Sequence, residues 1–286
     1  MSLSKILIAG CGDLGLELAR RLTAQGHEVT GLRRSAQPMP AGVQTLIADV
    51  TRPDTLASIV HLRPEILVYC VAASEYSDEH YRLSYVEGLR NTLSALEGAP
   101  LQHVFFVSST GVYGQEVEEW LDEDTPPIAK DFSGKRMLEA EALLAAYSST
   151  ILRFSGIYGP GRLRMIRQAQ TPEQWPARNA WTNRIHRDDG AAFIAYLIQQ
   201  RSHAVPERLY IVTDNQPLPV HDLLRWLADR QGIAYPAGAT PPVQGNKKLS
   251  NARLLASGYQ LIYPDYVSGY GALLAAMREG HHHHHH

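Results

Sequence analysis

Short apolar runs alternate with amphipathic stretches through the first 155 residues of the chain. In the amphipathic stretches apolar residues recur at helical spacing, as Leu14, Leu18 and Leu22 do, so these leucines should face a core. Strands that take turns with helices at this spacing are parallel and joined by right-handed crossovers. The pattern therefore predicts an α/β fold with a doubly wound parallel sheet covered on both faces. The expected strands cover 5–10, 28–32, 45–49, 65–72, 103–109 and 150–154, and the expected helices cover 13–25, 79–97 and 135–147.

Beyond residue 155 the alternation loosens, because loop-forming stretches such as GPGR and PAGATPPVQGN interrupt it. RLYIV and an amphipathic stretch at 221–231 remain regular, and we expect an edge strand near 208–213 to join the first sheet. The chain should therefore form one large domain and a smaller second lobe. The expected division is 1–155 with 184–215 for the large domain, 156–183 with 216–278 for the smaller lobe, and 279–286 for an expression tag.

The composition narrows the class of protein. The net charge is −2, and nucleic acids or acidic membranes are attracted by a basic field, so we expect neither as a partner. No apolar run is long enough to span a bilayer, and the N-terminal segment has strand character, so we expect a cytoplasmic protein. Cys11 and Cys70 are too few for a disulfide framework or a CxxC zinc site, so no metal is expected.

A glycine-rich turn, GCGDLG at 10–15, joins the first predicted strand to the first predicted helix. Gly10 permits a tight turn, Gly12 lets a ligand approach the backbone, and Gly15 allows close packing of helix on strand. A pyrophosphate would meet the free amides and the positive dipole end of the helix. The order of strand, turn and helix therefore predicts a dinucleotide site rather than a merely tight turn.

The second predicted strand ends in Arg33 and Arg34, where an NAD-selective site offers an acidic residue to the ribose hydroxyls. Guanidinium groups match a phosphate bidentately, so the pair predicts NADP(H) in preference to NAD. A solvated basic loop is the other interpretation. Asp49 could accept a hydrogen bond from the adenine, although an aspartate after a strand is more often a turn former. The predicted cofactor contacts are Gly10, Gly12, Asp13, Leu14, Gly15, Arg33, Arg34, Asp49, Val50 and Ala72.

Three further stretches resemble a known family: SSTGVYG at 108–114, LRFSGIYGPGR at 152–162 and NRIHRDDGAA at 183–192. With the glycine turn they resemble the extended short-chain dehydrogenase/reductase family, which contains NAD-dependent epimerases and dehydratases of nucleotide sugars. The likeness continues through 247–270, which is similar to the family's substrate lobe. It implies a Rossmann-type NAD(P)-binding fold, a small-molecule substrate such as a nucleotide sugar, and a homodimer formed through the helices near 79–97 and 135–147.

The family's chemistry uses a Tyr-x-x-x-Lys pair on a helix and an upstream Ser or Thr. Carried onto this chain, Ser109 matches the hydroxyl residue and Lys135 matches the lysine, which also holds the nicotinamide ribose. Asp131 stands where the tyrosine is expected, and Tyr85 stands where the family has asparagine. An ordinary aspartate, with a pKa of about 3.9, is ionised at neutral pH and cannot donate a proton. The chain thus resembles an atypical branch of the family that includes the bacterial YeeZ-like proteins.

Several residues could supply the missing acid. Tyr113 lies four residues after Ser109 and could point its phenol toward the nicotinamide, but a ring packed under that loop accounts for it equally well. Tyr85, Tyr158 and His186 are further candidates, each with a structural interpretation. Basic and aromatic loops at 162–167 and 174–183 could line a pocket for a phosphorylated or ringed substrate, or could be surface loops with two buried indoles.

Three hypotheses follow for the function. The first is an NADP(H)-dependent oxidoreductase or epimerase that acts on a hydroxyl or carbonyl carbon. The second is a sensor or scaffold that binds NADP(H) without chemistry, which loss of the tyrosine favours and retention of Ser109 and Lys135 opposes. The third is an epimerase that keeps its cofactor bound through oxidation and re-reduction.

Overall fold

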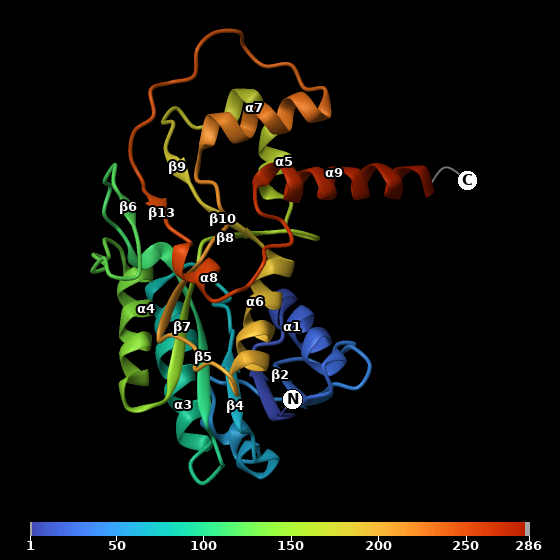
Figure 1. Cartoon of the computed structure of the whole chain (residues 1–286), viewed down its shortest axis with the longest axis vertical. Helices are drawn as coiled ribbons and strands as arrows, with labels where there is room; N and C mark the ends of the chain where they lie inside the picture. The colour runs from blue at the N-terminus through green and yellow to red at the C-terminus, as the bar shows by residue number, and fades with distance from the viewer. Residues whose placement is uncertain (1, 284–286) are drawn as a thin grey trace. The chain divides into compact units, whose positions relative to one another are not determined.

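A computed structural model describes residues 2–283 (Figure 1). The chain divides into two compact units. Unit 1 comprises 2–114, Pro126–Arg153 and Gly190–Tyr210. Unit 2 comprises Gln115–Thr125, Phe154–Asp189 and 211–283. The expected tag at 279–286 lies partly outside the described residues.

A parallel sheet of seven strands, as far as the described residues extend, is the framework of unit 1. The strand order is β11-β7-β5-β4-β1-β2-β3, so the chain reverses its direction of travel at β1 and places β11 at one edge. The predicted doubly wound sheet and its edge strand are therefore confirmed. The strands are β1 (Lys5–Ala9), β2 (Glu28–Arg33), β3 (Gln44–Ile47), β4 (Ile66–Tyr69), β5 (His103–Ser109), β7 (Ser149–Phe154) and β11 (Leu209–Val212).

The central strands are apolar because helices cover both faces of the sheet. Figure 1 shows α1 (Asp13–Ala24) on one side and α3 (Gly88–Ala95) and α4 (Phe132–Ala142) on the other. Leu14, Leu18 and Leu22 of α1 are buried, as their spacing predicted. Each buried leucine stabilises the fold by roughly 1.5–3 kcal/mol.

The helix predicted at 79–97 is continuous but not uniform. It begins as α2 (Asp78–Tyr81), widens into a π-helical segment (Arg82–Glu87) and continues as α3. Tyr69 at the end of β4 donates a hydrogen bond to the Ser84 carbonyl in that segment. A side chain at Gly88 would collide with the Tyr69 hydroxyl. The absence of a Cβ at Gly88 therefore lets the helix lie against the strand end, where π-helical turns often mark functional sites.

Unit 2 is built from three short strand pairs and four helices within the described residues. Its apolar core gathers Leu223, Leu224 and Leu227 of α7 around Ile166 and Tyr270. The strand pairs are β8 (Gly156–Tyr158) with β10 (Arg184–His186), β9 (Trp181–Thr182) with β12 (Leu218–Pro219), and β6 (Trp120–Leu121) with β13 (Lys248–Leu249); the helices are α5 (Arg164–Ala169), α7 (Val220–Gln231), α8 (Ala252–Ala256) and α9 (Tyr266–His283).

The helix α6 (Arg187–Gln200) begins in unit 2 and lies mainly in unit 1. Asp189 in its first turn accepts hydrogen bonds from the Tyr259 hydroxyl and from the backbone amides of Ile262 and Tyr263. It thereby holds the loop before α9.

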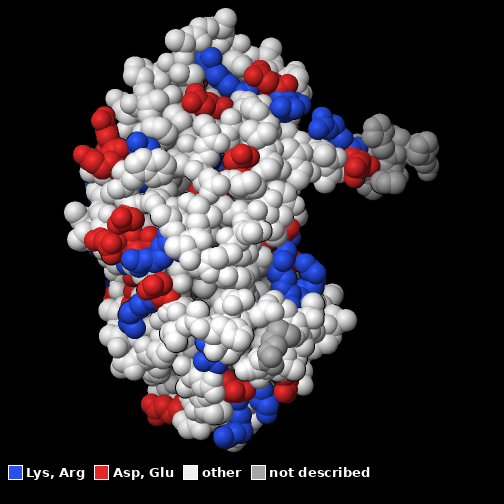
Figure 2. All heavy atoms as spheres, in the orientation of Figure 1, with Lys and Arg blue, Asp and Glu red and all other residues white. Residues whose placement is uncertain are grey.

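The surface carries both signs of charge. Figure 2 shows Lys and Arg side chains interspersed with Asp and Glu over the visible face. Of the helices in the described part of the chain, none combines the length and the apolar character needed to cross a bilayer.

Candidate cofactor site

The glycine turn has the backbone geometry that a dinucleotide site requires. Gly10 has φ +91°, and a Cβ there would lie 2.5 Å from Val71 Cα, so only glycine fits. A Cβ at Gly15 would lie 2.6 Å from the Gly10 carbonyl oxygen, which brings α1 close to the turn. Gly12 faces open space, because nothing lies within 4 Å of its Cβ position. The turn thus leaves room for a ligand at the helix N-terminus.

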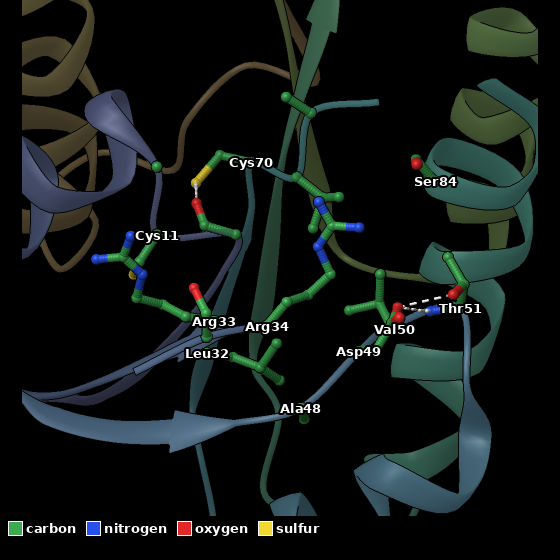
Figure 3. Close-up of a pocket in the computed structure, with 15 residues that line it drawn as sticks. Cys11, Leu32, Arg33, Arg34, Ala48, Asp49, Val50, Thr51, Cys70 and Ser84 are labelled. Atoms are coloured by element: carbon green, nitrogen blue, oxygen red, sulfur yellow. Dashed lines mark hydrogen bonds between the residues drawn. The ribbon is translucent and has the colours of Figure 1, made fainter. Parts of the chain in front are cut away.

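A pocket of about 260 Å³ opens at the carboxyl ends of β1, β2, β3 and β4 (Figure 3). The strand order reverses at β1, and open α/β sheets bind ligands at such a reversal. The structure brings most of the predicted cofactor contacts together in the lining of this pocket. They are Gly10, Gly12, Arg33, Arg34, Asp49, Val50 and Ala72.

The two arginines at the end of β2 differ in their environment. Figure 3 shows the Arg33 side chain extending toward Cys11 and the Arg34 side chain extending toward Val50. Arg33 donates hydrogen bonds to Gln37 and to the Met39 sulfur. Arg34 is exposed and has no hydrogen bond or ion pair within residues 2–283. Its guanidinium is therefore available to an anion from outside the chain.

Asp49 combines the turn-forming and ligand-facing interpretations. Its Oδ1 accepts hydrogen bonds from the backbone amide and hydroxyl of Thr51, at 2.9 and 2.7 Å, which fixes the turn after β3. The same side chain lines the pocket. Its second oxygen, Oδ2, is the atom that remains for a ligand.

Four predicted cofactor contacts do not line the pocket. Asp13, Leu14 and Gly15 belong to the first turn of α1, where Leu14 is buried in the core. Lys135 is exposed and lines a separate hollow with Asp131. The residues of the pocket that sequence reasoning missed are Cys11, Leu32, Ser35, Ala48, Thr51, Cys70, Val71 and Ser84.

Both cysteines lie in the pocket wall as unpaired thiols. Burial raises the pKa of Cys11 to about 12, against the opposing effect of the Arg33 charge. Burial likewise raises the pKa of Cys70, whose sulfur donates to the Gly10 carbonyl. A protonated thiol is a poor nucleophile, so both cysteines act as wall residues.

Ser109 ends β5, next to β4 in the sheet, and caps the short turn that follows. Its Oγ accepts a hydrogen bond from the Gly111 amide at 3.0 Å, and the side chain is partly exposed. Neighbouring Ser108 instead points into the core, where its hydroxyl donates to Glu141 at 2.6 Å. Because side chains alternate along a strand, Ser109 is the partly exposed serine at the carboxyl end of β5, whereas Ser108 is buried.

Tyr113 is fully buried, and its hydroxyl accepts a hydrogen bond from Arg153 at 2.7 Å. Arg153 also forms a two-pronged pair with Glu141, at 2.6 and 3.1 Å. Burial alone would lower the pKa of Arg153, but the hydrogen bonds that Arg153 donates to Glu141, together with the Glu141 charge, raise it. This network favours the packing interpretation of Tyr113 over the catalytic one.

Asp131, at the family's tyrosine position, is the N-cap of α4. Its Oδ1 accepts a hydrogen bond from the Gly134 amide at 3.2 Å, which starts the helix earlier than the sequence pattern indicated. Hydrogen bonds from the Ser133 hydroxyl and from backbone amides lower the pKa of Asp131. Asp131 is therefore an ionised cap at neutral pH.

The remaining residues that the sequence suggested as proton donors lie in packed surroundings. Tyr85 accepts a hydrogen bond from the Ala73 amide at 3.2 Å, and burial raises its pKa. Tyr158 stacks on Tyr270, and His186 stacks on Tyr263, within unit 2. These contacts favour structural roles for all three candidates.

The loop at 174–183 shows features of both interpretations offered for it. Trp175 donates its indole N–H to the Gln168 carbonyl at 2.9 Å. Arg178 pairs with Glu116 at 2.9 Å, and Lys248 lies over the Trp181 ring.

Among residues 2–283, no group of three or more His, Cys, Asp or Glu could hold a metal ion.

Comparison with known proteins places the chain in a family. A solved structure from Methylobacillus flagellatus, provisionally named an NAD-dependent epimerase/dehydratase, is 97% identical, covers 97% of this chain and 100% of its own, and superposes with a TM-score of 0.92. The 3-diazoavenalumate denitrifying reductase of a Streptomyces species is 25% identical over 93% of this chain and 99% of its own.

Protein YeeZ of Escherichia coli K12 is 27% identical over 56% of this chain and 61% of YeeZ, so the match spans less than two thirds of that relative. The resemblance drawn from the glycine turn, SSTGVYG and YGPG is thereby confirmed. The model of the NAD dependent epimerase/dehydratase family matches residues 6–212, most of the chain, and the protein belongs to that family.

Proposed function

We propose that the protein binds NADP(H) and catalyses hydride transfer at a hydroxyl or carbonyl carbon of a small substrate. The observation that carries the proposal is the pocket beside Gly12, with the unpaired Arg34 at its β2 wall. A helix N-terminus suits the pyrophosphate, and a guanidinium suits a ribose 2′-phosphate. An acidic residue in place of Arg34 would favour NAD instead.

The residues present fit such a cofactor. The amides after Gly12 would hold the pyrophosphate, Asp49 the adenine, and Arg33 with Arg34 the 2′-phosphate. When bound, the nicotinamide supplies or accepts the hydride. Ser109 would hydrogen-bond the substrate oxygen from the end of β5, and Lys135 stays a proposed ribose contact.

The substrate class we propose is a nucleotide sugar or another phosphorylated ring compound, and the denitrifying reductase among the relatives supports a reductive reaction as well. If the cofactor stays bound through oxidation and re-reduction, the reaction is an epimerisation. A second function, NADP(H) sensing without chemistry, is favoured by one observation: Asp131 is an ionised helix cap where the family has its proton donor.

Stereospecifically deuterated NADPH tests the proposal across a panel of aldehydes, ketones and nucleotide sugars. Deuterium in a reduced product supports hydride transfer, and changed stereochemistry of a nucleotide sugar without net coenzyme oxidation supports epimerisation. Tight NADPH binding with no deuterium transfer and no stereochemical change across the panel would instead favour the sensor.

A further inference from the structure

Tyr76, on the loop after β4, brings a phenol to the place where the family's tyrosine is missing. Its Oη lies 3.2 Å from Asp131 Oδ2 and 3.4 Å from the Ser133 hydroxyl. The side chain is 67% exposed, so a substrate can reach the hydroxyl. Tyr113, in contrast, is fully buried.

Aromatic contacts hold the exposed Tyr76 ring in place. Its centroid lies 4.8 Å from that of Phe132 and 5.5 Å from that of Tyr81, which meets it edge-on. Tyr81 and Phe132 also contact each other edge-on, at 5.6 Å. Such ring pairs stabilise a side-chain orientation. The hydroxyl is therefore positioned toward Asp131 rather than free in solvent.

A chain of short contacts links this phenol to Ser109. Asp131 Oδ1 accepts a hydrogen bond from the Gly134 amide, and a Cβ on Gly134 would lie 2.7 Å from the Gly111 carbonyl oxygen. Gly111 in turn donates its amide to Ser109 Oγ at 3.0 Å. The first turn of α4 thus packs directly on the turn that begins at Ser109.

The same loop borders the proposed cofactor pocket. Ala72 lines the pocket, and the Ala73 amide is fixed by the Tyr85 hydroxyl at 3.2 Å. Tyr76 follows four positions after Ala72 on the loop that leaves β4. The loop therefore connects a pocket wall to the Tyr76 phenol within a few residues.

We propose that Tyr76 is the catalytic acid and base of the proposed reaction and that Asp131 is its positioning residue. The proposal rests on the proposed hydride transfer. When a substrate alcohol is oxidised, its C–H bond breaks, and a bound nicotinamide coenzyme would accept the hydride. The hydroxyl proton passes to Tyr76 Oη while the phenol proton passes to Asp131 Oδ2 and on to water. Reduction of a carbonyl runs the same proton path in reverse, from water through Asp131 Oδ2 and Tyr76 Oη to the substrate oxygen, while the reduced coenzyme would supply the hydride.

Tyrosine nitration with tetranitromethane tests the placement of Tyr76 without a substrate. The chain has 14 tyrosines, so peptide mass spectrometry locates each nitro group. We expect Tyr76 to be nitrated in the free protein and saturating NADPH to slow that nitration about tenfold or more, because an acid within hydrogen-bond reach of the reacting centre would be shielded by the bound nicotinamide. A dinucleotide fragment without nicotinamide, 2′-phospho-ADP-ribose, should leave Tyr76 reactive. Tyr147, beyond the far end of α4, serves as the internal control.

The outcomes of the nitration experiment separate the two proposals. If NADPH does not bind, the proposed function fails. If NADPH binds but Tyr76 is nitrated equally with it, or if the fragment protects Tyr76 as well as NADPH does, the assignment of Tyr76 is overturned while the cofactor proposal stands.

Kinetics of Tyr76→Phe test its chemical role with any substrate found in the panel. Removing a general acid typically costs 10²–10⁴-fold in rate, so we expect kcat to fall by about 10²-fold or more with an unchanged Kd for NADPH. Tyr81→Phe removes a neighbouring hydroxyl from the same ring cluster and should stay within about twofold of wild type. A Tyr76→Phe variant with wild-type kcat would overturn the assignment.

Asp131→Asn tests the positioning role, because asparagine caps helices as well as aspartate but cannot accept the phenol proton. We expect kcat to fall about tenfold or more while KM, the Kd for NADPH and the thermal midpoint stay unchanged. A fall in thermal midpoint with unchanged kcat would show a purely structural role and overturn this part of the proposal.

Discussion

Arg153 Nη2 lies 2.6 Å from Glu141 Oε1 in the interior of unit 1, where each side chain is only 7% exposed. The pair joins α4 to β7, and hydrogen bonds from Arg153 to Tyr113 and from Ser108 to Glu141 complete the network. Such a network fixes the position of α4 against the sheet. It therefore supports the Ser109 turn that packs on the same helix.

Removal of one partner of this pair should destabilise the protein strongly. Glu141→Ala leaves the Arg153 guanidinium buried without its anion, and such losses typically cost about 3–5 kcal/mol. The combined variant Glu141→Leu with Arg153→Met removes both charges and should lose far less stability than Glu141→Ala. Urea unfolding measures both variants, and a Glu141→Ala protein as stable as wild type would refute the role of the pair.

Asp214, buried in unit 2, should make stability depend on pH. Burial raises its pKa from 3.8 to about 7, against the lowering effect of Arg184, and its Oδ2 has no hydrogen-bond partner among residues 2–283. The folded state thus binds the proton more tightly than the unfolded state. This contribution to stability is present below pH 3.8 and is lost as the pH rises through about 7.

Asp214→Asn removes this ionisation and should stabilise the protein above pH 7. At about 1.4 kcal/mol for each pKa unit, the expected gain at pH 8 is on the order of 2–4 kcal/mol, and it should vanish near pH 4. Thermal unfolding of both proteins across this pH range provides the measurement. A constant difference between wild type and variant would count against the titration.

Titration of the buried His103 should lower the stability of the protein as the pH falls, whereas titration of Asp214 lowers it as the pH rises. Burial lowers its pKa from 6.5 to about 4, helped by Arg201 and Arg208, and both ring nitrogens are engaged by Ser148 and Thr150 at 2.8 Å. The unfolded state takes up the proton first as the pH falls, so stability is lost between pH 6.5 and about 4. His103→Gln should reduce this loss by about 1–2 kcal/mol. Urea unfolding of wild type and His103→Gln at pH 7.5 and 4.5 measures this difference. Equal losses of stability in the two proteins would contradict the prediction.

The substitutions Gly12→Ala and Gly15→Ala should differ in their effect on the stability of the protein. Gly12→Ala meets no atom within 4 Å, so it should cost about 1 kcal/mol or less of stability, the usual cost of alanine at an N-cap. The methyl group would occupy the space proposed for the pyrophosphate, so NADPH affinity should fall about tenfold or more. Gly15→Ala collides with the Gly10 carbonyl and should lower both stability and affinity. Unchanged NADPH affinity in Gly12→Ala would contradict the proposed pose.

Local patterns predicted much of the fold because the relevant signals lie close together in the sequence. The glycine turn and the β2 arginines belong to one βαβ unit, so the sequence alone could assign Gly10, Gly12 and Arg34 to one site. Burial on both faces of the sheet also made the strand cores recognisable as apolar runs.

The remaining site residues depend on contacts between distant segments. Tyr76 reaches Asp131 across 55 positions in the sequence, and nothing in the spacing of either residue indicated the pairing. Ser84 reaches the pocket through the π-helical segment, whereas the apolar spacing predicted an ordinary helix. Glu141 has the helical spacing of the buried Met137 and Leu144, but a glutamate is usually exposed, and its buried ion pair with Arg153 could not be foreseen from the sequence.

Calorimetric titration of the protein, with the terminal histidines removed, against NADPH and NADH tests the central claim most directly. The account predicts saturable binding of NADPH that is about tenfold or more tighter than that of NADH. It further predicts that Arg34→Ala removes most of this preference without weakening NADH binding. Saturation with neither coenzyme, in a protein that is folded by circular dichroism, would contradict the account.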